Sequence, residues 1–288
     1  MSGEPGAAPA AAFVDLHSHS TASDGSQSPT VAVETAHGAG LTALALTDHD
    51  TLGGMPEAQI AADALGLRLV PGVELSVHQS DHEVHLLGLH IRDVARMQSD
   101  LVLYRDRRVA RALSIVDKLN VLGVAVTLDS VLAIANGGAV GRPHVAKALI
   151  VGGFVRDARE AFDRFLGAGR PGYVDKERLE IAEGIAMIHA AGGIAVLAHP
   201  GPEGRRERLE PLVAAGLDGI EIRHPSHSMD DIKRLTALTE FLGLVGSGGS
   251  DWHGAMKGGR MLGAMQVPQS WLDAQDARVE AVRAASAA

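Results

Sequence analysis

Short apolar runs alternate with longer segments of helical periodicity in the first 91 residues. The runs that predict buried strands are residues 13–16, 41–47, 67–77 (interrupted at Pro71-Gly72) and 83–91. Residues 29–40 and 55–65 have the spacing of helices, and Pro29 and Gly40 mark the start and end of the first. Such alternation is typical of a parallel α/β domain.

The same alternation returns in the second half of the chain. Helices are expected at residues 181–191, 206–215 and 229–242, and strands at 194–198, 219–223 and 244–247. Together the two halves predict a barrel of about seven strands, with an open doubly wound sheet as the alternative. In both architectures the functional face lies at the carboxyl ends of the strands.

Residues 92–176 interrupt this rhythm. They are mainly helical and rich in arginine, with helices expected at residues 102–122, 130–135, 143–151 and 157–166. We interpret this segment as a helical insertion over the mouth of the barrel. The predicted organisation is a flexible tail at 1–12, a barrel built from 13–91 and 177–288, and the insertion at 92–176.

Composition narrows the class of protein. Aromatic residues are 3% of the chain, so the core must be aliphatic, and long single-stranded nucleic acid would find few rings to stack on. The net charge of -9 argues against generic binding of duplex DNA. Cysteine is absent, which excludes thiolate ligands and thiol catalysis. We see no signal peptide and no membrane span, and expect a cytoplasmic protein.

Histidine and carboxylate residues gather at the ends of several apolar runs. His17 and His19 are two residues apart, so on a strand they project from one face and can chelate one ion. Asp251 and His253 repeat this spacing. Each segment alone has an ordinary structural explanation, such as a turn or a helix cap. Jointly they place nine metal-binding side chains at one barrel mouth, which predicts a metal-dependent hydrolase.

The segments DLHSHSTASDG, ALTDHD, PGVE, VHLLGLH, AHPG and GSDWH resemble the successive motifs of the polymerase and histidinol phosphatase (PHP) family of metallophosphoesterases. The match spans about residues 13–255. RPHVAKAL, GRPGYV and HPSHS resemble a narrower bacterial group that includes 3',5'-nucleotide bisphosphate phosphatases and 5'-3' exoribonucleases acting on short RNA. The resemblance implies a distorted seven-stranded (β/α) barrel with three divalent ions, with Mn favoured and Zn or Fe as alternatives.

The resemblance also assigns the ligands to three ions. His17, His19, Glu74 and Asp251 would hold the first, with Glu74 bridging to the second. His85 and His199 would complete the second site. The third would be held by Asp24, His49 and His253.

A phosphoester fits this set of ligands. Adjacent divalent ions would lower the pKa of a bridging water, giving a hydroxide able to attack phosphorus, with Glu74 between the ions. The departing oxygen would need a proton, for which Asp50, His144 and His227 are unranked candidates. Asp15 and Asp48 are expected to orient ligand imidazoles.

Substrate contacts are predicted on the insertion and on one barrel loop. Arg105, Arg108 and Arg111 fall on one helical edge that could grip a phosphate, with a solvated helix face as the alternative. Relatives in the group place arginines here against a 5'-phosphate. The remaining candidates are Arg142, His144, Ser226 and His227, with His227 favoured over His224.

The leading hypothesis is removal of the 3'-phosphate from 3',5'-bisphosphonucleotides, such as pAp, to leave the 5'-nucleotide. The alternative is 5'-3' exonuclease action on short 5'-phosphorylated oligonucleotides, which would use the same pocket. Histidinol phosphate hydrolysis, C–N bond hydrolysis and a non-catalytic metal-binding module follow. The expected partner is thus a small nucleotide or oligonucleotide, and the sequence leaves the oligomeric state open.

Overall fold

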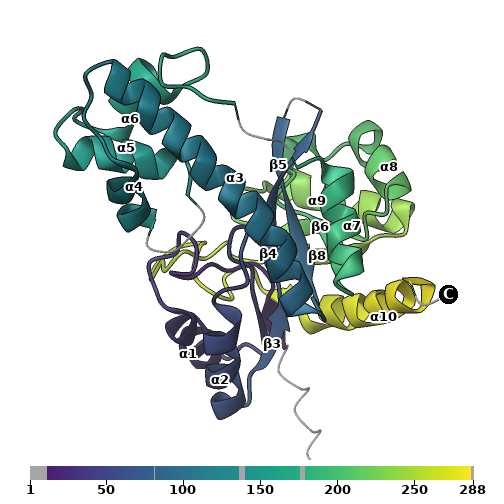
Figure 1. The fold of residues 1–288 in the computed structure, drawn as a ribbon. Coiled ribbons are helices and arrows are strands. Elements are labelled where there is room, and N and C mark those ends of the chain that lie inside the picture. The colour runs from purple at the N-terminus through teal and green to yellow at the C-terminus, as the bar shows by residue number, and fades with distance from the viewer. Residues whose placement is uncertain (1–11, 81, 136–139, 176–178, 287–288) are drawn as a thin grey trace, which may run out of the picture.

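The computed structural model describes residues 12–80, 82–135, 140–175 and 179–286, so residues 1–11 of the predicted tail lie outside it. Its strands form two sheets (Figure 1). The first has the order β3-β2-β1-β9, with bounds Arg68–Pro71, Ala43–Leu46, Phe13–Asp15 and Val267–Pro268. The second has the order β4-β5-β6-β7-β8, with bounds Val73–Gln79, His82–Leu89, Ile194–Leu197, Gly219–Arg223 and Val245–Gly248.

The two sheets meet along both edges and form a nearly closed barrel. The Leu16 N–H donates to the Gly248 carbonyl at 3.1 Å, which joins the end of β1 to β8. A parallel bridge between His49 and Glu74 joins the end of β2 to the start of β4. The predicted α/β barrel is confirmed, and the described residues form nine strands where about seven were expected.

Two local features explain the difference in strand number. Residues 67–77 form two strands in different sheets, and the chain crosses between the sheets at Gly72. A Cβ at Gly72 would lie 2.8 Å from Thr47 Cγ2, so this close passage needs glycine. The second added strand, β9, has two residues and therefore carries no readable periodicity.

The barrel is not wholly parallel, because β5 runs antiparallel to both β4 and β6. Only two residues separate β4 from β5 in the sequence, which allows a hairpin but not a parallel crossover. The pairing extends from Val73–Gly88 to Gln79–His82. The tip of this hairpin therefore projects beyond the barrel mouth (Figure 1).

Helices surround the barrel on its outer side. They are α1 (Pro29–Gly38), α2 (Met55–Leu65), α7 (Ile181–Ala190), α8 (Arg206–Ala214), α9 (Met229–Leu242) and α10 (Gln269–Ser286), with a 3-10 turn η2 at Gly201–Glu203. Capping residues set several of their ends: Ser28 accepts from the Val31 N–H, and Gly66 ends α2 in the left-handed region. The sequence did not lead us to expect α10.

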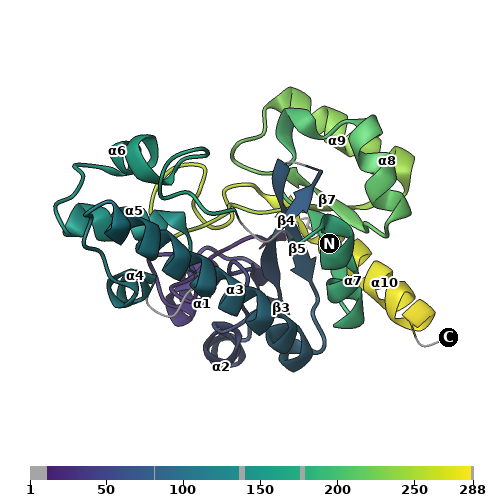
Figure 2. The same cartoon turned by 45° about the horizontal axis from the view of Figure 1, so that its top comes forward.

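The helical insertion has its own hydrophobic core. It contains α4 (Leu128–Ala135), α5 (Arg142–Val151), α6 (Ala158–Ala161), the π-helical turn η1 (Phe162–Leu166) and most of α3 (Val94–Val121). Figure 2 shows it on the opposite side of the β4–β5 hairpin from α8 and α9. The division into barrel and insertion domains stays a prediction.

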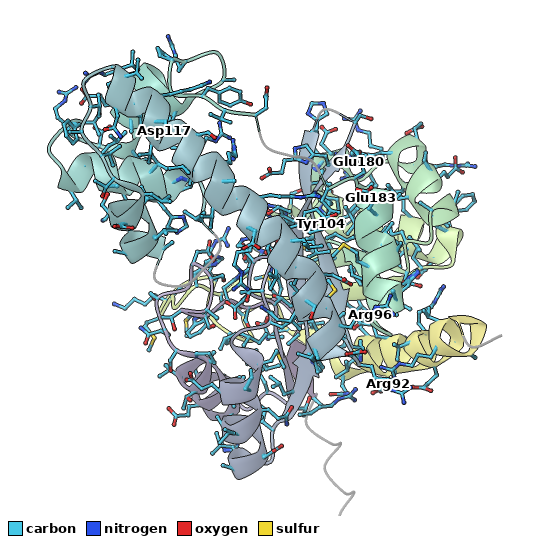
Figure 3. All side chains as sticks on the ribbon, viewed as in Figure 1. Arg92, Arg96, Tyr104, Asp117, Glu180 and Glu183 are labelled. Carbon is cyan, nitrogen blue, oxygen red and sulfur yellow. The ribbon has the colours of Figure 1, made fainter. Side chains whose placement is uncertain are left out.

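Helix α3 joins the two parts and begins earlier than predicted, because Asp93 caps it through the Arg96 N–H. Met97 and Leu101 in its first half pack in the barrel core, and Leu119 in its second half packs in the insertion core. Arg96, Tyr104 and Asp117 mark its course from the barrel to the insertion in Figure 3. Among the helices in the described ranges, none combines the length and apolar character that crossing a bilayer requires.

Candidate metal centre

All nine predicted ligands meet at the barrel mouth, although not all follow the end of a strand. Glu74 lies at the start of β4 and His85 in the middle of the antiparallel β5. Glu74 lies beside His49 because a parallel bridge joins these two residues. His85 lies near His199 because its neighbour Leu86 pairs with Leu197, two residues before His199. The other ligand positions lie just after β1, β2, β6 and β8: His17, His19, Asp24, His49, His199, Asp251 and His253.

The first group consists of His17, His19, Glu74 and Asp251, whose ligand atoms all lie within 4.8 Å of one another. Glu74 Oε2 is 3.1 Å from the Nε2 atoms of both His17 and His19. Asp251 Oδ1 is 3.4 Å and 3.2 Å from the same two nitrogens. Two carboxylate oxygens and two imidazole nitrogens therefore face one point.

The second group uses the other oxygen of Glu74. Glu74 Oε1 lies 2.7 Å from His85 Nδ1 and 3.1 Å from His199 Nε2. His49 Nδ1 lies 3.4 Å from Glu74 Oε2. Glu74 is thus shared between two groups, as a bridging carboxylate would be.

The third group lies around Asp24. Its Oδ1 is 3.3 Å from His253 Nε2 and 3.7 Å from His19 Nδ1, and its Oδ2 is 3.8 Å from His49 Nε2. The two nitrogens of His19 therefore face different groups. The structure brings together the three sets that the resemblance implies, and the ligand roles themselves stay a prediction.

The nitrogen and oxygen atoms of the cluster are arranged better for binding metal ions than for hydrogen bonding to one another. Both ring nitrogens of His19 and Nδ1 of His49 are buried without a hydrogen-bond partner in the described residues. Ligand bonds of roughly 2.1 Å place neighbouring ligand atoms roughly 3.0–3.4 Å apart. The nitrogen–oxygen distances in the first group lie within or next to this range. Buried polar atoms without partners are costly, and bound cations would satisfy them.

Charges in the cluster compensate one another. Burial lowers the pKa of His17, but the Glu221 and Glu74 carboxylates outweigh it and hold that pKa well above its ordinary value. Burial also acts on His19, where contacts with Asp251 and Glu74 prevail and raise the pKa to about 9. Burial would raise the pKa of Glu74, yet His17 and His49 hold it well below the usual range. Cation binding would release the protons that the imidazoles carry.

Glu221, on β7, supports the cluster and was missed from the sequence. It is fully buried, its Oε1 lies 3.0 Å from His17 Nδ1, and its Oε2 accepts from the His199 N–H at 2.8 Å. It therefore fixes the ring of His17 and the backbone of His199. The signal was available, since an acidic residue stands between Ile220 and Ile222 in a buried strand.

Asp15 and Asp48 do not orient imidazoles, so that expectation is wrong. Asp15 accepts from the backbone N–H groups of Ser250 and Gly263. Asp48 accepts from the side chains of Ser20 and Ser23 and holds the loop that carries Asp24. Both residues secure loops that carry predicted ligands.

Three of the four predicted arginines line a cavity of about 410 Å³ between the insertion and the β4–β5 hairpin. Arg108, Arg111 and Arg142 contribute to its wall, together with Phe162 and Tyr173. Arg142 lies over both rings, with its guanidinium carbon 5.7 Å and 5.4 Å from their centroids. The pocket therefore presents three guanidinium groups, with the carboxylates of Glu83 and Asp175 also in its wall.

Each arginine also has a protein contact that sets its position. Arg108 pairs with Asp50, and Arg111 donates to the Val174 carbonyl at 2.9 Å. Arg105 differs, because it donates to Thr51 Oγ1 at 3.0 Å and does not line the cavity.

The histidines near the mouth separate into two kinds. His144 Nδ1 accepts from the Gly141 N–H at 3.0 Å, so a neutral ring carries its proton on Nε2. His227 is buried, and its two nitrogens contact the Gly201 N–H and the Ile222 carbonyl. These backbone contacts give His227 a structural position.

His224, which the sequence ranked below His227, lies closer to the cluster. Its Nε2 is 3.4 Å from Asp251 Oδ2, and its Nδ1 is 2.7 Å from Ser226 Oγ. His224 and Ser226 both line the cavity above the cluster.

Arg260 was also missed from the sequence. It lines the cavity above the cluster, and its Nη1 contacts Asp251 Oδ2 and the Asp251 carbonyl. The side chain is 48% exposed and comes from the glycine-rich loop after His253. A cation this close to the ligand segment could have been suspected, but loops give no periodicity that predicts side-chain direction.

Comparisons with known proteins agree with this geometry. The PHP domain model matches residues 15–121. A 3',5'-nucleoside bisphosphate phosphatase from Chromobacterium violaceum is 38% identical over 260 residues, covering 88% of this chain and 91% of that protein. A 5'-3' exoribonuclease from Haemophilus influenzae is 40% identical over 249 residues, covering 83% and 89%.

A solved structure from Bifidobacterium adolescentis, assigned as a metal-dependent phosphoesterase, matches with a TM-score of 0.78 and 32% identity. The match covers 94% of this chain and 98% of that one. The chain therefore belongs to the PHP domain family of metal-dependent phosphoesterases.

Proposed function

We propose that the protein removes the 3'-phosphate from 3',5'-bisphosphate nucleotides and releases the 5'-nucleotide and inorganic phosphate. One observation carries the proposal: a pocket lined by three arginines lies next to a cluster suited to divalent cations. A substrate with two phosphates, one for the pocket and one for the cluster, fits this pair. The similarity to a nucleoside bisphosphate phosphatase supports the same substrate class.

The arginine pocket would take the 5'-phosphate. Guanidinium groups bind phosphate oxygens through paired N–H donors, and Arg108, Arg111 and Arg142 supply three such groups. The backbone links the pocket to the cluster, since Asp50 follows His49 and its N–H donates to the Glu74 carbonyl at 2.9 Å. We assign Asp50, which also accepts from the Ser76 N–H, to positioning Arg108.

The cluster would take the 3'-phosphate. We assign three ions to the groups described above, with manganese as the leading candidate because the donors are imidazoles and carboxylates without thiolates. When bound, such ions activate water and neutralise phosphoryl oxygens as the phosphorus is attacked. Glu74, shared by two groups, would hold their spacing fixed.

The departing 3'-oxygen would be stabilised by a hydrogen-bond donor and would take its proton from water, and we assign the donor role to His144. Burial lowers the pKa of His144, and the Asp24 carboxylate acts on that pKa in the opposite direction. Because Nδ1 accepts from the Gly141 N–H, the ring is neutral and its Nε2–H is the group that can donate a hydrogen bond to a substrate oxygen. Asp50 and His227 are occupied by protein contacts and are not needed for this step.

Arg260 and Ser226 would contact the phosphoryl group itself. Only Nη1 of Arg260 has a hydrogen-bond partner among the described residues, which leaves Nε and Nη2 for phosphoryl oxygens. Both residues line the cavity of about 460 Å³ above the cluster. This position suits a cation that stabilises negative charge on phosphate.

A panel of substrates tests the proposal. Protein loaded with Mn²⁺ is incubated with adenosine 3',5'-bisphosphate, 3'-AMP, 5'-AMP and histidinol phosphate, and released phosphate is measured. We expect the bisphosphate to give the highest kcat/KM, about 100-fold above that of 3'-AMP, and EDTA treatment to abolish release. Phosphate release from 5'-AMP at the rate seen with the bisphosphate would refute the proposal.

A second activity, 5'-3' cleavage of short 5'-phosphorylated oligonucleotides, is favoured by one further observation. A cavity of about 580 Å³ adjoins the cluster on the side of α8. A bisphosphate nucleotide would occupy the arginine pocket and the cluster and would leave this third cavity unfilled.

A further inference from the structure

The cavity beside the cluster is a groove continuous with the metal site. His85 and His199 line both the groove and the cavity above the cluster. The other residues that line the groove are His82, Glu83, Val84, Leu197, Ala198, Pro200, Glu203 and Arg208. At about 580 Å³ it has the size of a small-ligand site.

The groove results from the way the strands diverge. Pairing between β5 and β6 ends at Leu86–Leu197, while β5 continues into the projecting hairpin and the chain after β6 turns into η2 and α8. Arg208 on α8 spans the gap, donating from Nε to Gln79 Oε1 on β4 at 2.6 Å. This contact fixes the width of the groove.

The lining is mixed rather than uniformly basic. Arg208 supplies one cation, and its Nη1 lies 3.9 Å from Glu203 Oε2. Val84, Leu197, Ala198 and Pro200 supply apolar surface. A single nucleoside with the phosphate on its 3' side, which has a sugar and an apolar base face, suits such a lining better than a long polyanion does.

The position of the groove relative to the arginine pocket indicates which part of a substrate it could hold. The arginine pocket lies on the insertion side of the β4–β5 hairpin and the groove on the α8 side, as Figure 2 shows for these elements. A substrate with its 5'-phosphate in the pocket and its 3'-phosphorus at the cluster would leave the groove empty. In an oligonucleotide, one oxygen of that phosphorus bears the next nucleoside.

We propose that this groove binds the nucleotide that follows the scissile phosphodiester in a short 5'-phosphorylated oligonucleotide. The inference rests on the proposed function of the cluster and pocket. Water would add to phosphorus and the P–O3' bond would break. The first nucleotide leaves with a proton on O3', and the phosphate stays on O5' of the second. The same bond breaks in the bisphosphate, so both substrates need one chemistry.

Arg208→Ala tests the groove through a ratio. We expect the kcat/KM for a 5'-phosphorylated trinucleotide, whose second phosphodiester would lie in the groove, divided by that for adenosine 3',5'-bisphosphate, to fall about tenfold, as loss of one phosphate contact predicts. Arg206→Ala is the control, because Arg206 lies on the same helix but pairs with Glu210 and covers the Phe241 ring. An unchanged ratio in Arg208→Ala would overturn the proposal.

Glu203 allows a second test without loss of the Arg208 contact to Gln79. Its side chain is 69% exposed, so a larger residue there fills the groove without disturbing the core. Glu203→Trp should lower the same ratio about tenfold, whereas Glu203→Gln should keep or raise it. A ratio that falls equally in both variants would contradict a steric role for the groove.

A cross-linking experiment separates this inference from the proposed function. A 5'-phosphorylated dinucleotide with 4-thiouridine at its second position is irradiated with the Mn²⁺-loaded protein, and the modified peptides are identified by mass spectrometry. We expect modification within residues 82–85 or 198–208. Modification confined to residues 92–175 would overturn the groove assignment, whether or not the protein cleaves either substrate.

Discussion

The metal cluster and the arginine pocket are neighbours, yet they are built differently. Glu74 is 1% exposed and contacts five imidazoles, so each ligand side chain is held by several others. The pocket arginines come from the insertion, and each has its own separate contacts, which for Arg111 and Arg142 include a backbone carbonyl. The cluster is interdependent, whereas the pocket consists of separable contacts. We therefore expect mutations in the cluster to abolish chemistry and mutations in the pocket to change selectivity.

We expect the largest loss of activity from His19→Ala, a change within the cluster. Because the two nitrogens of His19 face two groups, its loss should lower kcat by about 10³-fold or more for every phosphoester tested. Activity and metal content are measured together, the latter by inductively coupled plasma mass spectrometry. His37→Ala, which changes an exposed histidine on α1, is the matched control. Retention of both activity and metal in His19→Ala would refute the cluster assignment.

Arg108→Ala should separate selectivity from chemistry. We expect about a 100-fold loss in kcat/KM for adenosine 3',5'-bisphosphate, since a charge-assisted phosphate contact is removed. Activity on bis(p-nitrophenyl) phosphate, which lacks a 5'-phosphate, should change less than threefold. Steady-state assays on both substrates give the comparison.

Arg96→Ala is the control, because Arg96 lies on the barrel end of the same helix (Figure 3) and pairs with Asp100. Equal losses on both substrates in Arg108→Ala would show that the pocket and cluster are not separable.

Glu221→Gln tests whether a residue that supports the cluster affects metal affinity without removing a predicted ligand. The amide keeps the size of the side chain but removes the charge that supports His17, so metal affinity should fall roughly 10–100-fold. Activity should recover at high Mn²⁺, which distinguishes this variant from His19→Ala. Titration of activity with Mn²⁺ measures the effect, and Glu240→Gln on the surface of α9 is the control. An unchanged titration would contradict the positioning role.

The smallest effect concerns pH. The pKa of His19 is about 9 in the ion-free fold and lies above its unfolded value, so this group stabilises the ion-free protein fully below pH 6.5. That stabilisation is lost as the pH rises through 9. Metal binding must displace the same proton, so metal affinity rises over this range and offsets the loss, leaving the stability of the metal-loaded protein nearly independent of pH. Thermal unfolding from pH 7 to 9.5 should show a falling Tm with EDTA and a nearly constant Tm with Mn²⁺.

Sequence was sufficient for the barrel and the cluster because both depend on local regularities. Apolar runs mark buried strands, and the paired spacing of His17 with His19 and of Asp251 with His253 survives without tertiary information. The antiparallel β5 was missed because a buried strand has the same pattern in either direction. Its direction depends on the two-residue connection after Gln79.

The substrate side was harder to predict because its contacts join distant segments. Arg105 and Arg108 are spaced to lie on the same edge of a helix, yet Arg105 contacts Thr51 and Arg108 lines the pocket. His227 was favoured over His224 as a substrate contact, yet His224 lies closer to the cluster, and only the fold shows that backbone atoms contact both nitrogens of His227. Arg260 lies on a loop, where spacing says nothing about direction.

The cluster draws its donors from both ends of the chain, and this has a consequence during synthesis. His17 and His19 emerge early, but Asp251 and His253 emerge only after more than two hundred further residues, including the whole insertion. With the ligand roles proposed above, a growing polypeptide would carry an incomplete chelator, and its first histidines would not retain a divalent ion as the finished barrel would. Capture of metal would then be a late event that reports closure of the barrel between β1 and β8.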